Sequence, residues 1–273
     1  MEKQDSYLME STQEALRLVI KTNPEDVKKQ AKWFGIGPGA RVLDVGCGSG
    51  KTTSILHEMV QPGGYVLGVD FSPERIAYAR EVFGSKEGID FQIMNFTCPM
   101  DTLDQFDFIW VRFILEYFLK ESFSIIKNLI PCLKKEGILC LMDLDYNCLN
   151  HYPISENMEN ILQRLMLFMS KDFNFDPYAG RKLYTYLFDH GFRDTKVHLM
   201  AHHLIYGDLR SQDHFNWMKK IEMVSKNAPD VFDAYPNGPE DFIRDFEAFF
   251  KNPRRFTYTP LIMCKGKKPL KNI

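Results

Sequence analysis

The chain has 273 residues, of which 45% are hydrophobic and 26% are charged, and its net charge is −2. This composition is that of a globular protein with a large core, and it excludes a disordered chain. The charge balance provides no basic stripe that could neutralise phosphates, so we expect no nucleic-acid partner. No apolar run approaches the roughly 20 residues that span a bilayer, so we expect no membrane partner.

Cysteine usage and the N-terminus predict a cytoplasmic protein. The six cysteines lie scattered without a C-x-x-C pair, so we expect neither a disulfide framework nor a metal site. Free thiols are typical of a reducing compartment. The charged N-terminus also lacks the apolar core of a secretion signal.

Helical patterns occupy the first 37 residues. An amphipathic helical stretch over residues 1–30 is interrupted at residues 23–26, and a second helix over residues 27–34 ends at a group of glycines and a proline. We expect residues 1–37 to form an N-terminal helical lid.

A strand, a glycine turn and a helix follow. The apolar run over residues 40–45 contains Asp44, glycines occupy positions 46, 48 and 50, and Lys51 begins a helical pattern. Glycine permits positive φ and lets backbone N–H groups approach a ligand, and a helix N-terminus favours negatively charged ligand groups. This stretch therefore predicts a ligand-binding loop.

Two common ligand loops fail to match this stretch by one residue each. The dinucleotide pattern G-x-G-x-x-G needs a glycine at position 51, which is lysine. The phosphate loop G-x-x-x-x-G-K-[ST] fits Gly50-Lys51-Thr52 but needs a glycine at position 45, which is valine. The pattern that fits is Asp-x-Gly-x-Gly-x-Gly after an apolar strand.

Two further strands continue this pattern. Residues 65–70 form an apolar strand that ends at Asp70, a carboxylate placed as expected for holding two ribose hydroxyls. A third strand over residues 89–94 leads to Asn95 and Phe96. Strands at 106–112 and 138–144 complete an alternation with helices, which predicts a parallel sheet covered on both faces.

With these motifs the sequence resembles the class I S-adenosylmethionine-dependent methyltransferases of the small-molecule type. Specific motifs carry the resemblance over roughly residues 38–147, and only the order of the elements carries it beyond. It implies an α/β, Rossmann-like fold with a seven-stranded, mostly parallel sheet and helical cap insertions. It also implies S-adenosylmethionine as cofactor, S-adenosylhomocysteine as product and a small-molecule substrate.

The resemblance also implies a set of cofactor-binding residues. Gly46, Cys47 and Gly48 would present backbone to the methionine end, and Asp70 would hold the ribose. Asn95, where the family commonly has Asp, would accept a hydrogen bond from the adenine amino group. The remaining candidates are Phe71 and Phe96 on either side of the adenine, Arg112 and Phe113 beside the methionine part, and Tyr7 on an N-terminal helix that folds over the cofactor.

After residue 147 the strand–helix alternation stops. We expect helices at 153–172 and 177–190, a long strand at 195–206, two helical stretches within 210–251 and a final strand at 255–263. Earlier in the chain, we expect a charged turn at 133–137 before the fifth strand. The core at 38–147 would continue at 177–209, interrupted by a cap insertion at 148–176 and followed by a helical insertion at 210–252. Residues 253–273 would be the final strand and tail.

The cap helices, rich in Met, Phe and Tyr, predict a lid over the methyl group and a small, partly apolar acceptor. We assign no catalytic residue, although His151 lies where a base could reach an acceptor. Methyl transfer needs no strong base when nucleophile and activated methyl group are held in line. The O-, N- or C-nucleophile stays open, as does the oligomeric state. Two alternatives remain: a non-catalytic S-adenosylmethionine-binding or interaction module, and a nucleotide hydrolase that uses Gly50-Lys51-Thr52.

Overall fold

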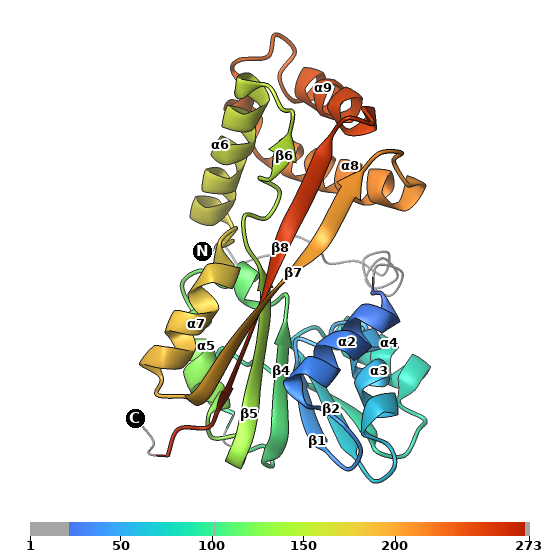
Figure 1. Cartoon of the computed structure of the whole chain (residues 1–273), viewed down its shortest axis with the longest axis vertical. Helices are drawn as coiled ribbons and strands as arrows, with labels where there is room; N and C mark the ends of the chain where they lie inside the picture. Colours follow the sequence, from blue (N-terminus) through green and yellow to red (C-terminus); the bar gives the residue numbers. More distant parts are fainter. Residues whose placement is uncertain (1–21, 101, 271–273) are drawn as a thin grey trace.

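A mixed β-sheet organises the molecule (Figure 1). The computed structural model describes residues 22–100 and 102–270, and within this part of the chain the sheet has eight strands. They are β1 (Arg41–Val45), β2 (Tyr65–Asp70), β3 (Ile89–Ile93), β4 (Phe106–Arg112), β5 (Leu133–Leu144), β6 (His151–Tyr152), β7 (Arg193–Tyr206) and β8 (Phe256–Lys267). The first five are parallel in the order β3-β2-β1-β4-β5. β8 pairs antiparallel with β5, and β7 and β6 pair antiparallel with β8.

Helices cover both faces of the parallel strands, which explains why these strands are nearly continuous apolar runs. On one face, α2 (Pro24–Phe34) and α3 (Lys51–Val60) pack around the buried Trp110. On the other, α5 (Ser122–Leu129) and α7 (Ala179–Asp189) pack around Leu139 and Leu141. Helix α4 (Pro73–Phe83) packs against β2 and β3.

Two helix starts follow capping signals in the sequence. Asn23 accepts a hydrogen bond from the Glu25 N–H at 3.0 Å before α2, and Ser72 accepts one from the Arg75 N–H at 3.3 Å before α4. A proline follows each capping residue, because its fixed φ suits the first helical position. The interruption expected at residues 23–26 is therefore the N-terminus of α2.

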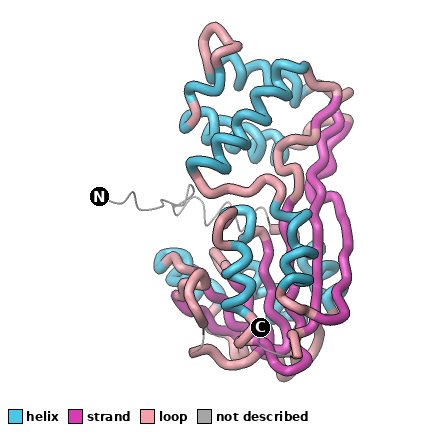
Figure 2. The backbone as a smooth tube through the Cα atoms, turned by 90° about the vertical axis from the view of Figure 1, so that its left-hand side faces the viewer, coloured by secondary structure: helices cyan, strands magenta, loops and turns pink. Residues whose placement is uncertain are grey.

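A second, smaller core forms a cap beyond the carboxyl ends of the parallel strands (Figure 2). It consists of α6 (Glu156–Asp172), α8 (Ser211–Asn227), the short 3₁₀ helix η2 (Pro229–Phe232) and α9 (Pro239–Lys251), whose apolar faces meet around Trp217 and Phe246. β7 and β8 run from the core sheet up into this cap. No helix in the described ranges has both the length and the apolar character needed to cross a bilayer.

The α/β fold is confirmed, and three local expectations are wrong. The charged turn expected at 133–137 lies inside β5, which begins at Leu133 and bulges there before pairing again with β4. The final strand continues to Lys267 rather than ending at 263. The cap is not made of helices alone, since the two residues of β6 add an eighth strand at the upper end of β8.

Candidate functional site

The glycine loop after β1 is fastened to β2 by its own backbone. The N–H groups of Gly46 and Cys47 both donate to the Val69 carbonyl, at 2.8 and 3.0 Å. Gly46, Gly48 and Gly50 have φ values of 69°, 53° and 81°, a region that other residues rarely adopt. The backbone path of this loop therefore depends on glycine at all three positions.

Neighbouring side chains close in on the loop from two sides. A Cβ at Gly46 would overlap Cδ1 of Ile114, which lies just after β4, and a Cβ at Gly50 would lie 2.8 Å from Cβ of Ala79 in α4. Cys47 is 7% exposed and packs inward with Phe91. Burial raises the pKa of the Cys47 thiol, so the side chain is a neutral packing group, and its Sγ lies 3.9 Å from the Gly48 carbonyl of the loop.

Asp70 ends β2 beside this loop. One carboxylate oxygen accepts the Gly48 N–H at 2.9 Å, and the other accepts the Ser72 N–H at 3.0 Å and lies 3.9 Å from the Arg75 guanidinium. The residue is only 2% exposed. A carboxylate has about four acceptor positions, so two remain after these two N–H bonds. The loop and the strand end thus form one hydrogen-bonded unit with spare acceptors.

A second buried carboxylate, Asp44, lies at the end of β1. It accepts a hydrogen bond from the Thr53 hydroxyl of α3 at 2.7 Å and is 3% exposed. Burial raises its pKa to about 7, against the lowering effects of the Thr53 hydroxyl and the positive charge of Arg112. Near neutral pH this carboxyl therefore exchanges between its protonated and ionised forms.

Arg112 ends β4 and is oriented by two contacts. Its Nε donates to the Gln30 side chain of α2 at 3.0 Å, and its guanidinium lies 4.2 Å from the ring centroid of Phe113. Phe113 has φ of 58°, a strained value for a large side chain, and its ring lies 4.8 Å from that of His202. Burial lowers the pKa of Arg112 to about 10, which leaves it cationic at neutral pH.

The residues expected around the adenine differ in how they are placed. Phe71 is partly exposed, whereas Phe96 is 1% exposed and belongs to the main core; their ring centroids lie 6.3 Å apart. The Asn95 side-chain oxygen already accepts two hydrogen bonds from Thr97, at 3.0 Å from its N–H and 2.7 Å from its hydroxyl. Asn95 can accept from a ligand only if one of these bonds is given up.

Two other candidates stand apart from this group, one because the structure does not describe it and one because of its position. Tyr7 lies outside the described residues. His151 packs inside the cap, where Thr257 donates to its Nδ1 at 2.9 Å, its Nε2–H donates to the Cys148 carbonyl at 3.2 Å, and its ring lies 5.1 Å from Trp217. Burial lowers the pKa of His151 to about 4. A neutral histidine with both ring nitrogens engaged is poorly suited to act as a base.

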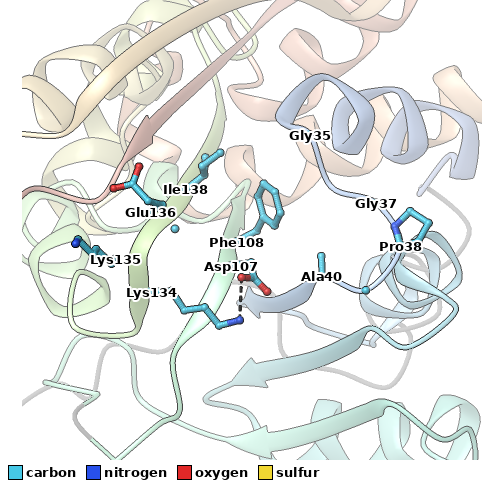
Figure 3. Close-up of a pocket in the computed structure, with 12 residues that line it drawn as sticks. Gly35, Gly37, Pro38, Ala40, Asp107, Phe108, Lys134, Lys135, Glu136 and Ile138 are labelled. Carbon is cyan, nitrogen blue, oxygen red and sulfur yellow. Dashed lines mark hydrogen bonds and ion pairs between the residues drawn. The ribbon is translucent and has the colours of Figure 1, made fainter.

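The opposite end of the sheet carries an open groove (Figure 3). It lies at the amino ends of β4 and β5, where Lys134 and Asp107 form an ion pair of 2.8 Å, and the residues after α2 complete it. Ligands of open α/β sheets bind at the carboxyl ends of the strands, so this groove lies at the wrong end. No group of three or more metal-ligating side chains occurs within residues 22–100 and 102–270.

The structure adds three residues to the site that the sequence pattern does not reveal. Gln30 orients Arg112 from 82 positions away, Thr53 holds Asp44, and Ile114 closes the loop over Gly46. Only Thr53 had a local signal, because it lies in the first turn of the helix that follows the loop.

Comparison with known proteins assigns the family and the fold. Residues 36–192, more than half of the chain, match the family model described as a methyltransferase domain. The chain belongs to this methyltransferase family. Its sheet order and its antiparallel final pair are those of the Rossmann-like class I methyltransferase fold. Membership favours the methyltransferase prediction over the nucleotide-hydrolase alternative.

Individual methyltransferases match in part. A stretch of 100 residues, 37% of the chain, is 30% identical to trans-aconitate 2-methyltransferase of Escherichia coli and spans only 37% of that relative. A protein of Bacillus halodurans C-125 assigned to the methyltransferases matches over 90% of this chain and 99% of its own, with TM-score 0.61 and 17% identity. Phosphoethanolamine N-methyltransferase 2 of Haemonchus contortus, solved with S-adenosylhomocysteine, matches over 93% of this chain and 56% of its own, with TM-score 0.56 and 16% identity. At these identities the two structures show the fold alone.

Proposed function

We propose that this chain binds S-adenosylmethionine at the carboxyl edge of its parallel strands and transfers the methyl group to a small-molecule acceptor. The observation that carries the proposal is Asp70, a buried carboxylate 2.9 Å from the Gly48 N–H of the glycine loop. Family membership and the Haemonchus relative solved with S-adenosylhomocysteine support the choice of cofactor.

The donor set fits this cofactor. Two acceptor positions of Asp70 remain after the Gly48 and Ser72 N–H bonds, which matches the two ribose hydroxyls. Because Asp70 is screened from water, each of these hydrogen bonds is stronger than it would be on the surface. Arg112 is cationic and beside the loop, so it is suited to the methionine carboxylate.

The residues around the methionine end would hold the cofactor and orient its methyl group. Bound S-adenosylmethionine supplies a methyl group that its sulfonium has already activated. Gln30 fixes Arg112, and Ile114 closes over Gly46, so the loop keeps one conformation. Asp44 places negative charge near the site in its ionised form. Catalysis in this proposal comes from positioning, which does not require a strong base.

A small acceptor is favoured over a macromolecule. The trans-aconitate and phosphoethanolamine relatives are named for small molecules. The net charge of −2 provides no basic surface for binding nucleic acid.

The six cysteines are free thiols, which supports a cytoplasmic location. The proposal keeps Tyr7 and the N-terminal lid of residues 1–37 as part of the site.

Calorimetry followed by a turnover assay tests the proposal. The full-length chain should bind S-adenosylmethionine and S-adenosylhomocysteine at micromolar or lower concentrations and should not bind ATP with magnesium. Transfer of a radiolabelled methyl group to members of a panel of carboxylates, amines and phenols should then identify the acceptor. Binding of ATP in place of S-adenosylmethionine would refute the cofactor, and binding without turnover on any acceptor would favour the non-catalytic module.

A further inference from the structure

The cap exposes an apolar surface made of β-strand side chains, which we call the aromatic face. It consists of Tyr152 of β6, Leu204 and Tyr206 of β7, and Phe256 and Tyr258 of β8. Strand register places Tyr152 and Tyr206 on either side of Phe256, and Leu204 opposite Tyr258. The rings of Phe256 and Tyr258 lie 5.7 Å apart. These five side chains therefore form two adjacent rows on one face of the sheet.

The opposite face of the same strands is buried in the cap. Ile205 is 4% exposed, and Thr257 and Thr259 are fully buried, because α8 and α9 pack on that side. By contrast, the exposed fractions are 73% for Tyr152, 65% for Tyr206, 49% for Leu204, 42% for Phe256 and 39% for Tyr258. Side chains alternate between the two faces of a strand, so one face is covered by the cap helices and the aromatic face is not. A sheet face of this kind is unusual on a monomer unless it meets a partner.

The size of the aromatic face matches one half of a protein interface. With about 200 Å² for each aromatic side chain, the exposed fractions of the four aromatics give about 440 Å² of apolar surface. A stable interface covers about 800 Å² on each partner, of which about 56–65% is apolar, or about 450–520 Å². Leu204 adds the small remainder. Tyrosine and phenylalanine are also the residues enriched at interfaces.

We infer that the aromatic face binds the aromatic face of a second copy of this chain, forming a two-fold symmetric dimer. A two-fold interface uses the same patch on both subunits, which requires a patch that complements itself. This one is free of charged residues, so two copies bring no like charges together. Charges of both signs lie next to its ends along the chain: Asp208 follows Tyr206 and Arg254 precedes Phe256, as expected for the polar rim of an interface.

Access to the aromatic face also favours a second copy. Within the described ranges β7 pairs only with β8, so no further strand flanks the face on that side. Two sheet faces can then approach to the usual spacing of about 10 Å and interleave their side chains. An anionic lipid surface would need lysine or arginine within the patch, and the five residues include neither. This inference goes beyond the proposed function and does not depend on it.

The molecular mass in solution tests the dimer. Sedimentation velocity and light scattering of the full-length chain at 5 and 100 μM should give twice the chain mass of 31.9 kDa at the higher concentration. Tyr206→Lys should raise the dimer dissociation constant at least tenfold, because the symmetry brings two buried lysines to the same interface. Tyr258→Lys, on the neighbouring strand, should act in the same way. Both variants should keep the far-UV circular dichroism spectrum of the wild type and unfold cooperatively, since the replaced side chains lie outside the core of the single chain.

Phe215→Lys is the matched control. Phe215 is an aromatic residue of α8 that is 55% exposed and lies outside the aromatic face, so its replacement should leave the dimer intact. A wild-type chain that stays at the monomer mass at 100 μM would overturn the inference, whatever else covers the face. So would a dimer that persists in the Tyr206 and Tyr258 variants or is lost equally in the Phe215 variant. Binding of S-adenosylmethionine, measured on the same samples, reports separately on the proposed function.

Discussion

Replacing Asp70 by asparagine should weaken cofactor binding while leaving the chain folded. The substitution keeps the shape and one acceptor oxygen but removes the charge and turns one oxygen into an NH₂ group. Hydrogen bonds to a charged acceptor contribute about 1.5–3 kcal/mol, and neutral ones about 0.5–1.5 kcal/mol. Losing one ribose bond costs about 1.5–3 kcal/mol and weakening the other about 1–1.5 kcal/mol. The total of about 2.5–4.5 kcal/mol raises the Kd for S-adenosylmethionine about 70- to 2,000-fold.

The same carboxylate also stabilises the folded chain, because the Gly48 and Ser72 N–H groups both donate to it. In Asp70→Asn one of these buried donors loses its acceptor, which should lower the free energy of unfolding by about 1–3 kcal/mol. Urea unfolding measures this loss and shows whether the variant is folded under the conditions of the binding assay. Calorimetry with S-adenosylmethionine and S-adenosylhomocysteine then gives the two Kd values on folded protein.

Asp107→Asn is the matched control for this substitution. Asp107 also accepts a backbone N–H, that of Arg41 at 2.9 Å, and also pairs with a cation, Lys134 at 2.8 Å. It lies at the amino end of β4, away from the glycine loop, so its replacement should affect stability without changing binding. A Kd within about threefold of wild type in Asp70→Asn, or an equal loss in both variants, would refute the role assigned to Asp70.

Three further predictions follow from contacts and charges in the structure. Gly46→Ala should lower the free energy of unfolding by about 2–4 kcal/mol, because the added Cβ overlaps Ile114 and the φ at this position is positive. The double variant Gly46→Ala/Ile114→Ala should recover only the part of this loss that comes from the overlap. A urea midpoint of Gly46→Ala equal to that of the wild type would contradict the prediction. The pKa of His151 is about 4 in the folded chain and 6.5 when unfolded, so the unfolded chain binds more protons, and stability should fall by about 2 kcal/mol from pH 7 to pH 5. His151→Gln should lack this part of the pH dependence, and equal losses in both proteins would contradict the prediction. The pKa of Asp44 is about 7, and a nearby cation favours its ionised form. S-adenosylmethionine should therefore bind up to about tenfold more tightly at pH 8 than at pH 6. The Kd of S-adenosylhomocysteine, which has no sulfonium charge, should change less between these pH values, and calorimetry measures both.

The parts of the fold that local sequence determines could be predicted. Burial on both faces makes the parallel strands apolar runs, and the capping residues Asn23 and Ser72 mark helix starts within a few positions. The glycine loop is also a local feature, because its positive φ values need glycine whatever surrounds it. These signals are sufficient to give the sheet, the loop and the acid at the end of β2.

Features that depend on distant partners could not be predicted. Residues 134–137 have the composition of a turn and form the bulge of β5. The pairs with β4 on either side, Leu133 with Phe106 and Ile138 with Phe108, and the Lys134–Asp107 ion pair keep this segment within the strand. His151 follows the fifth strand, where a base could lie, but Thr257 comes from 106 positions away to bond its ring. In both cases the contacts that decide the outcome join segments far apart in the chain.

Three buried acids at neighbouring strand ends show why position alone does not define a binding residue. Asp44, Asp70 and Asp143 end or nearly end β1, β2 and β5, and each is at most 3% exposed. Asp143 accepts the N–H groups of Glu116 and Leu144, and burial, together with the nearby Glu116 carboxylate, raises its pKa. Asp44 is bonded to Thr53, and burial raises its pKa as well. Asp70 alone among the three accepts an N–H from the glycine loop, so a ligand that bonds to it also meets that loop. The partner of the carboxylate, rather than its place at a strand end, therefore selects Asp70 as the ribose-binding residue of the proposed site.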